Sequence, residues 1–272
     1  MKTIIIIPAY NVEFKINAVL SLLFKYKDDT LVVDDGSTDN TSKVVENIGF
    51  KFFRHNRNLG LAHTLNSGLR YAIEKNYESV ITLDSDNQHD PGYIDVFLNK
   101  LSNYECVFGN RFSTFNNVPT CKIASNFFAS LLVYSITGLK LRDVSCGYRG
   151  FQLSNGLSAI SNSDSFSVIY EFLYNIIEKN VKFTIVDIPV VYSYDELLCT
   201  KVSEIDGLIK ASLKYCKTQN LRSILNKILL KISKKEDFHF CIGGFDFFCF
   251  YISTVNSYIF QTDINKVDLF YK

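Results

Sequence analysis

The 272-residue sequence lacks several features that mark common classes of protein. It has no excess of one charge, with 29 basic against 28 acidic residues, whereas nucleic-acid-binding proteins usually carry a basic excess or stripe. Its seven cysteines include no Cys-x-x-Cys pair, so we expect free thiols rather than a disulfide framework or a zinc site. No clear run of about 20 apolar residues is present to cross a bilayer. We therefore expect no nucleic-acid partner, and a protein of a reducing, cytoplasmic compartment.

The first apolar run, Ile4 to Ile7, ends at Pro8 without a glycine-rich loop behind it. Residues 8–13 contain no glycine, which argues against a dehydrogenase with a Gly-x-Gly-x-x-Gly loop and against a nucleotidyltransferase with a glycine-rich phosphate loop. The run is also too short for a secretory signal and has no small-residue cleavage site. It predicts a buried first strand instead.

Short β-branched runs alternate with longer segments of helical apolar spacing, which predicts an α/β fold with a mostly parallel central sheet and flanking helices. The expected strands are Ile4–Ile7, Leu31–Val33, Phe52–Phe53, Val80–Leu83, Cys106–Phe108 and the returning strand Lys182–Pro189. The expected helices are Ile16–Phe24, Thr41–Ile48, Leu61–Ile73, Ile94–Leu101, Ile123–Thr137 and Val168–Glu178. Ligands of such sheets bind beyond the carboxyl ends of the strands.

Two carboxylates and an amide follow the fourth expected strand. Asp84, Asp86 and Gln88 are spaced two residues apart, so in an extended turn their side chains project the same way. Two carboxylates that face one point repel each other unless a cation lies between them. Because Mg²⁺ prefers a few carboxylates together with phosphate oxygens, the pattern predicts a divalent metal that bridges to a diphosphate. Taken alone, an Asp-x-Asp pattern is also common in solvated turns.

A second acidic pair, Asp34 and Asp35, ends the second expected strand and leads through a Gly-Ser turn into a helix. Carboxylates at this position suit hydrogen bonds to a ribose or a base. The helix is predicted to be capped by Asp39 or Asn40. An ordinary strand–turn–helix connection uses the same residue types, so the pattern by itself leaves both interpretations open.

Taken together, the motifs resemble the family 2 glycosyltransferases of the GT-A fold, and within them the dolichol-phosphate mannose synthases and polyprenyl-phosphate glycosyltransferases. The resemblance covers roughly residues 1 to 210 and is carried by an ordered series of motifs. These are residues 8–11 (Pro-Ala-Tyr-Asn), 32–39 (Val-Val-Asp-Asp-Gly-Ser-Thr-Asp), 58–62 (Asn-Leu-Gly-Leu-Ala), 83–89 (Leu-Asp-Ser-Asp-Asn-Gln-His), 109–112 (Gly-Asn-Arg-Phe), 143–149 (Asp-Val-Ser-Cys-Gly-Tyr-Arg), and Ile188-Pro189 with Thr200-Lys201.

The resemblance implies inverting, metal-dependent transfer of a hexose from a UDP- or GDP-linked donor to a polyprenyl or dolichyl phosphate. It implies that Asp84, Asp86 and Gln88 hold Mg²⁺ or Mn²⁺, and that the catalytic residues are Asp84, Asp86, Asp143 and Arg149. The implied substrate-binding residues are Pro8, Tyr10, Asn11, Asp34, Asp35, Asn58, Gly60, Arg111, Thr200 and Lys201. If the acceptor is instead a hydroxyl of a glycan or cell-wall polymer, a general base is needed, and Asp143 is the first candidate.

Some residues depart from the family pattern. Val12 separates the Pro-Ala-Tyr-Asn motif from Glu13, and Asp195 and Leu198 stand where related synthases often carry arginine and glycine. The inserted Val12 weakens a role of Glu13 in nucleotide binding. Asp195, Leu198 and the unusual C-terminal region keep open an inactive, nucleotide-sugar-binding relative. Processive polysaccharide synthases carry a tryptophan in a downstream motif, and this chain has none.

Residues 1–215 are predicted to form the catalytic domain, followed by an apolar, amphipathic region over residues 216–272. Leu221, Ile224, Leu225, Ile228, Leu229 and Ile232 form one helical stripe, with basic residues opposite. Such a helix suits an anionic bilayer, which would place the protein at the cytoplasmic face of a membrane, or it simply packs on the catalytic domain. The apolar segment Phe238–Ser253 is short and carries His239 and Asp246, so it is a weak candidate for a membrane span.

Overall fold

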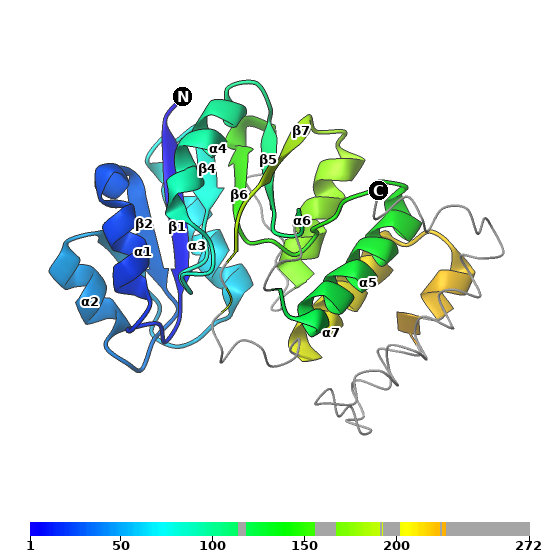
Figure 1. Ribbon diagram of the computed structural model, residues 1–272, viewed down its shortest axis with the longest axis horizontal. Helices are drawn as coiled ribbons and strands as arrows, with labels where there is room; N and C mark the ends of the chain where they lie inside the picture. Colours follow the sequence, from blue (N-terminus) through cyan, green and yellow to red (C-terminus); the bar gives the residue numbers. More distant parts are fainter. Residues whose placement is uncertain (114–117, 156–166, 191, 193–201, 224, 227–272) are drawn as a thin grey trace.

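The computed structural model describes residues 1–113, 118–155, 167–190, 192, 202–223 and 225–226. It consists of one seven-stranded sheet with a layer of helices on each face (Figure 1). The predicted α/β fold with a mostly parallel sheet and flanking helices is confirmed.

The sheet has the strand order β3-β2-β1-β4-β6-β5-β7, and every strand except β6 runs in the same direction. The strands are β1 (Thr3–Ala9), β2 (Thr30–Asp34), β3 (Lys51–Arg54), β4 (Ser79–Thr82), β5 (Cys106–Asn110), β6 (Arg149–Gln152) and β7 (Phe183–Asp187). Strand β1 lies near the centre and is buried on both faces, which explains its continuous isoleucine run.

Two hydrophobic clusters cover the two faces of the sheet. Ile4 and Ile6 point into the cluster that contains residues of α3 (Leu61–Glu74), α5 (Thr120–Thr137), α6 (Ser167–Glu178) and α7 (Val202–Tyr215). Ile5 and Ile7 point into the opposite cluster, which contains residues of α1 (Ile16–Leu22), α2 (Thr41–Ile48) and α4 (Ile94–Leu101). Short 3₁₀ helices span η1 (Phe24–Asp29), η2 (Pro91–Tyr93) and η3 (Leu153–Asn155).

The sequence-based expectations match these elements to within a few residues at their ends, except that two elements were not predicted. Strand β6 (Arg149–Gln152) was missed because its Arg-Gly-Phe-Gln sequence shows neither a β-branched run nor strict alternation. Helix α7 was missed although Ile205, Leu208 and Ile209 have helical spacing and are buried. The expected strand at 182–189 is β7, which pairs in parallel with β5.

The segment beyond residue 215 packs on the same core as far as the structure describes it. Cys216, Leu221 and Leu225 are buried and belong to the cluster that contains α5, α6 and α7. This burial agrees with the packing interpretation for the start of the basic helix, whereas residues 227–235 and Phe238–Ser253 lie outside the described residues. Within the described residues no helix is both long and apolar enough to cross a membrane. The domain boundary at 215 stays a prediction.

Candidate active site

Four strand ends bring the predicted site residues to one edge of the sheet. Strands β1, β2 and β4 reach this edge with their carboxyl ends, whereas the antiparallel β6 begins there. The register pairs Ala9 with Asp34 and Thr82 with Arg149. Because β6 runs opposite to its neighbours, its first residue, Arg149, lies beside the last residue of β4, Thr82. Thr82 precedes Asp84, the first residue of the predicted metal motif, by two positions.

The carboxylates Asp84 and Asp86 lie close enough to influence each other's ionisation. The Asp84 side chain is 36% exposed and lines a hollow whose wall is mostly apolar. Burial and the nearby Asp86 charge raise the pKa of Asp84 to about 7, against the opposing effect of Arg111 and Arg149. Gln88 is partly buried, and its backbone N–H donates to Asp86 Oδ1 at 3.0 Å, which closes the turn.

This pair of carboxylates fits a divalent cation whose other ligands are phosphate oxygens. Among the described residues no cluster of three His, Cys, Asp or Glu side chains forms a complete metal cage. Two carboxylates and the Gln88 amide are instead the incomplete oxygen set typical of sites where Mg²⁺ is shared with a substrate phosphate. Burial first and the Asp86 charge second raise the pKa of Asp84, and a cation bound between the two carboxylates would favour their ionised forms.

Gly147 makes room for the Asp84 carboxylate. A Cβ at position 147 would lie 2.6 Å from Asp84 Cγ and closer still to both carboxylate oxygens, whereas real Cβ contacts are longer than 3.0 Å. The Gly147 carbonyl accepts a hydrogen bond from Thr82 Oγ1 at 2.7 Å, so its backbone is tied to the end of β4. Gly147 belongs to the motif at residues 143–149, whose pattern alone predicts no role for it.

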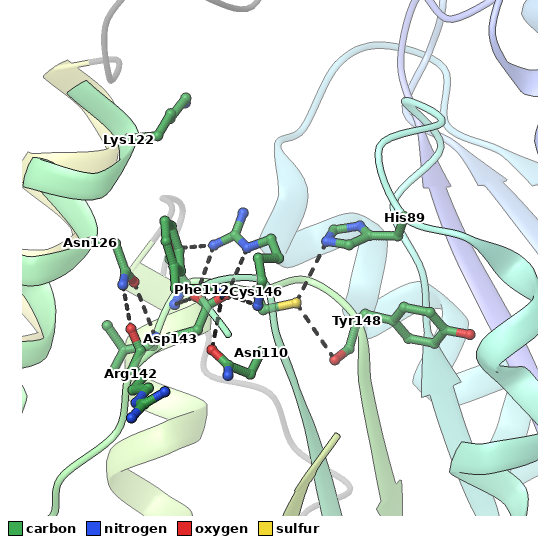
Figure 2. A network of polar contacts seen from close by, with 12 residues as sticks. His89, Asn110, Phe112, Lys122, Asn126, Arg142, Asp143, Cys146 and Tyr148 are labelled. Carbon is green, nitrogen blue, oxygen red and sulfur yellow. Dashed lines mark hydrogen bonds and ion pairs between the residues drawn. The ribbon is translucent and has the colours of Figure 1, made fainter. Parts of the chain in front are cut away.

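Arg111 and Asp143 form a buried ion pair. Arg111 Nε donates to Asp143 Oδ2 at 2.7 Å and Nη2 to Oδ1 at 2.9 Å, and the Arg111 and Ser145 backbone N–H groups also donate to this carboxylate. The surrounding contacts are drawn in Figure 2. Burial opposes the ionisation of Asp143, but the Arg111 charge and these hydrogen bonds outweigh it and lower the pKa. Asp143 is therefore a weak base that positions Arg111, which disfavours its predicted role as a general base.

Removing one partner of this ion pair is expected to destabilise the fold strongly. Asp143→Ala should lower the free energy of unfolding by about 3–5 kcal/mol, because it leaves the Arg111 guanidinium buried without its carboxylate. Urea denaturation followed by circular dichroism measures the loss. Asp95→Ala is the control, since it removes an ion pair with Lys25 in which both side chains are more than half exposed. Equal losses in the two variants would contradict a structural role for the buried pair.

Arg149 is a buried cation whose hydrogen bonds go to backbone carbonyls. Its guanidinium donates to the carbonyls of Val144, Cys146 and Ile169 at 2.7–3.1 Å. It also lies 5.5 Å from the ring centroid of Phe108 and 5.6 Å from that of Phe172. No carboxylate of the described residues forms an ion pair with it. Its positive charge is therefore not neutralised by a carboxylate of the described residues, and the side chain lines the pocket described next.

One pocket joins three of the predicted site residues. Pro8, Asp84 and Arg149 line a hollow of about 440 Å³, counted with its part open to solvent. The remaining wall is mostly apolar and is built by α3, β6 and α6. Thr82 and Gly147 complete it. Its apolar side chains are Leu61, Leu65, Phe151, Val168, Ile169 and Phe172. The pocket thus combines an acidic and a basic group with a hydrocarbon surface.

The acidic pair after β2 holds the surrounding loops together. Asp34 has no exposed side-chain surface; it accepts from the Ser37 backbone N–H at 2.8 Å and from the Ser42 hydroxyl. Asp35 accepts from the backbone N–H groups of Leu59 and Gly60 at 2.9 and 2.8 Å. Both carboxylates therefore stabilise the backbone around the predicted nucleotide pocket, and Asp34 reaches no open space.

His55 extends the Asp35 network and was not singled out from the sequence. Its Nδ1 lies 2.7 Å from Asp35 Oδ1, and its Nε2 lies 2.9 Å from Ser67 Oγ on α3. The ring, which directly follows β3, therefore connects Asp35 to Ser67 of α3. No motif marked it, because its partners are twelve and twenty residues away in the sequence.

The other predicted substrate-binding residues lie around this edge. Asn11 has a left-handed backbone (φ 52°), and its Oδ1 accepts from the Thr38 backbone N–H at 2.8 Å. Tyr10 is 43% exposed, and Asn58 is exposed. Thr200 and Lys201 lie outside the described residues, as do Asp195 and Leu198.

The predicted cap of α2 involves Glu13, the residue that Val12 separates from the Pro-Ala-Tyr-Asn motif. Asn40 occupies the cap position without a side-chain bond to the helix, whereas Asp39 Oδ1 accepts from the Thr41 N–H at 2.9 Å. Glu13 Oε2 in turn accepts from the Asn40 backbone N–H at 2.9 Å. In this structure Glu13 therefore supports the turn from which α2 begins.

His89 is a further residue to which the sequence analysis assigned no role. Its side chain is 1% exposed, with Nε2 3.6 Å from Cys146 Sγ (Figure 2). Its Nδ1 lies 3.8 Å from Asp84 Oδ2. Burial and the Arg111 charge lower the pKa of His89 to about 3, so the ring is neutral at physiological pH.

Comparison with known proteins places the chain among glycosyltransferases. An uncharacterised protein of Methanocaldococcus jannaschii is 34% identical over 78% of this chain and 98% of its own length. A UDP-N-acetylglucosamine–dolichyl-phosphate N-acetylglucosaminyltransferase of Methanococcus voltae is 29% identical over 71% of this chain and 86% of its own. An undecaprenyl-phosphate mannosyltransferase of Micrococcus luteus is 27% identical over 75% and 88% of the two chains.

The fold has counterparts among solved structures. Glucosyl-3-phosphoglycerate synthase of Mycobacterium tuberculosis, solved with Mn²⁺, UDP and glucosyl-3-phosphoglycerate, superposes with a TM-score of 0.61 over 78% of this chain and 80% of its own, at 15% identity. The family model described as glycosyl transferase family 2 matches residues 4–161, which include both acidic motifs, Arg111 and Arg149. Because this match spans more than half of the chain and agrees with the geometry of the strand ends, the chain belongs to glycosyl transferase family 2.

Proposed function

We propose that this chain is an inverting, metal-dependent hexosyltransferase that moves a sugar from a UDP- or GDP-linked donor to a polyprenyl or dolichyl phosphate. The observation that carries the proposal is the single pocket lined by Pro8, Asp84 and Arg149, with an apolar wall beside them. Relatives named as dolichyl- and undecaprenyl-phosphate glycosyltransferases, each matched over most of its length, support the same acceptor class.

The donor diphosphate is assigned to the side of the pocket formed by the metal motif. Asp84, Asp86 and Gln88 would hold Mg²⁺ or Mn²⁺, which supplies positive charge to the leaving diphosphate when it is bound. Arg111, held in place by Asp143, adds a fixed positive charge near Asp84. The residues around Asp35 would then form the nucleotide end of the site.

The polarity of the pocket favours a lipid phosphate over a glycan hydroxyl as acceptor. A phosphate is already ionised near neutral pH and attacks without a general base, whereas a hydroxyl needs one. Asp143, the candidate base, is buried in its ion pair with Arg111 and has a lowered pKa. The buried charge of Arg149 suits a phosphate, and the apolar wall suits the adjoining hydrocarbon.

A lipid acceptor implies that the protein works at a membrane surface, which we assign to the cytoplasmic face. The described start of the basic helix does not itself provide the contact, because Leu221 and Leu225 are buried against the domain. Membrane association stays a proposal for the protein as a whole. The alternative acceptor, a glycan or cell-wall hydroxyl, requires a base other than Asp143 in its present position.

A thermal-shift titration tests the donor site. We expect UDP or GDP, or one of their hexose conjugates, to raise the melting temperature in Mn²⁺ and to have little effect in EDTA. A ligand that binds only the folded state stabilises it by about 2.7 kcal/mol at a hundredfold excess over its Kd. AMP in Mn²⁺ controls for non-specific effects.

The outcome separates the active enzyme from an inactive relative. A shift with one nucleotide names the base of the donor. Metal-dependent binding without any transfer to a polyprenyl phosphate or a glycan would favour an inactive, nucleotide-sugar-binding relative. A folded protein that responds to no nucleotide would contradict the proposed function.

A further inference from the structure

His89 differs from the other polar residues of the Asp-x-Asp-x-Gln-His motif because its side chain is almost completely buried. Its side chain is 1% exposed, whereas that of Asp84 is 36% exposed. The His89 backbone forms an isolated antiparallel bridge with Val190, and its ring lies edge-on to the ring of Tyr148, with the centroids 5.9 Å apart. Both the backbone and the ring are therefore held in place by the protein itself.

One nitrogen of this buried ring has no hydrogen-bond partner among the described residues. That atom is Nδ1, which lies 3.8 Å from Asp84 Oδ2. A buried N–H group without a partner is costly and rare in folded proteins. Because Asp84 is partly exposed, its carboxylate can rotate, and a movement of about 1 Å would bring the two atoms to hydrogen-bonding distance.

The other ring nitrogen lies against a thiol that can fix the tautomer. Nε2 is 3.6 Å from Cys146 Sγ, and Figure 2 shows the ring of His89 directed at this sulfur. The thiol has one proton, and two acceptors lie near its sulfur: His89 Nε2 at 3.6 Å and the Tyr148 carbonyl oxygen at 3.9 Å. When the thiol donates to Nε2, the nearer of the two, the ring carries its proton on Nδ1, on the side of Asp84.

We propose that His89 is a positioning residue for the metal site: its Nδ1–H donates to the Asp84 carboxylate and orients it for a divalent cation, while Cys146 fixes the tautomer. The proposal rests on the proposed function, because it assigns a metal to Asp84. Groups that hydrogen-bond to metal-binding carboxylates orient them and contribute to metal affinity. Gly147, from the other side, leaves space for the same carboxylate.

Three substitutions of His89 distinguish a role in positioning the Asp84 carboxylate from a role in packing alone. His89→Asn keeps an N–H donor near the place of Nδ1, His89→Gln keeps one near the place of Nε2, and His89→Leu keeps only volume. We measure the Kd of Mn²⁺ in saturating UDP or GDP by electron paramagnetic resonance. Binding of the same nucleotide in EDTA and thermal unfolding are measured in parallel as controls for folding.

We expect His89→Leu and His89→Gln to weaken Mn²⁺ binding by about 10- to 100-fold. His89→Asn should recover most of the affinity, and nucleotide binding in EDTA should change little in any of the three. The inference is overturned if His89→Leu binds Mn²⁺ as the wild type does, or if His89→Gln recovers the affinity as well as His89→Asn. If His89→Leu does not fold, the comparison of the other two variants decides. If the wild type itself binds no Mn²⁺, the assignment of a metal to Asp84 is overturned. This result distinguishes a failure of the proposed function from a failure of the role proposed for His89.

Discussion

Asp84→Asn is expected to reduce sugar transfer to a polyprenyl phosphate by about a thousandfold, while the protein stays folded. The substitution keeps the shape of the side chain but removes the charge that would hold the cation against the donor diphosphate. A steady-state transfer assay with saturating Mn²⁺ measures the loss. Asp90→Asn is the matched control, because Asp90 is an exposed carboxylate in the same loop whose remaining oxygen still accepts from Gly92 N–H.

The same substitution should lower transfer but raise the stability of the metal-free protein relative to the wild type at neutral pH. Asp84 has a pKa raised to about 7 in the folded protein, so the folded state binds more protons than the unfolded state between about pH 4 and pH 7. Because His89, with its lowered pKa, contributes a change of the opposite sign in the same window, the test is the difference between the two proteins: in EDTA, the stability of Asp84→Asn relative to the wild type should rise as the pH rises through this window. A substitution that left transfer intact, or that unfolded the protein at every pH, would contradict the assignment of Asp84.

Gly147→Ala is expected to cause a loss of transfer comparable to that of Asp84→Asn, although it adds only a methyl group. The new Cβ would lie 2.6 Å from Asp84 Cγ, so the carboxylate must move away from the position in which it faces Asp86. Gly147 has no left-handed backbone conformation, and the strain therefore falls on the Asp84 side chain rather than on the main chain. Mn²⁺ affinity should weaken together with kcat.

Gly150→Ala, on β6 and three residues after Gly147, is the control for the cost of an added methyl group. Its Cβ would meet only the side chains of Leu101 and Phe97, at 3.1–3.4 Å, so we expect about 1–3 kcal/mol of destabilisation with Mn²⁺ affinity unchanged. Unfolding curves and Mn²⁺ titrations on both variants separate the two effects. If both variants lost metal affinity equally, a general distortion of β6 would replace the specific contact as the explanation.

Most of the fold could be predicted because its signals are local. The isoleucines of β1 and the helical spacing of α2 and α4 follow from the periods of strands and helices, and these elements lie where they were expected. Strand β6 carries no such signal. It occupies its place because β4 and β5 both pair with it, and pairing between residues more than 40 positions apart is not encoded in the pattern of four residues.

The site was predictable at the level of residue types and not at the level of their partners. The motif that contains Asp84 and Asp86 predicted two interacting carboxylates, and the structure places them close together. The pairing of Arg111 with Asp143, the full burial of Asp34 and the contact between His89 and Cys146 depend on tertiary packing. An isolated sequence motif does not reveal whether a carboxylate faces a substrate or an internal arginine.

The pairing of β6 with β4 also bears on how the enzyme could change its specificity. Thr82 and Arg149 are partners in this ladder, so backbone hydrogen bonds set the separation between the acidic turn and the buried guanidinium. Under the proposed function, that separation would be shared by every substrate that enters the pocket. Selection between sugars and bases would then fall to the loops after β1, β2 and β3, which can diverge without altering the spacing of the proposed reacting groups. The proposed chemistry and the choice of substrate would in this way be separable traits of the same sheet edge.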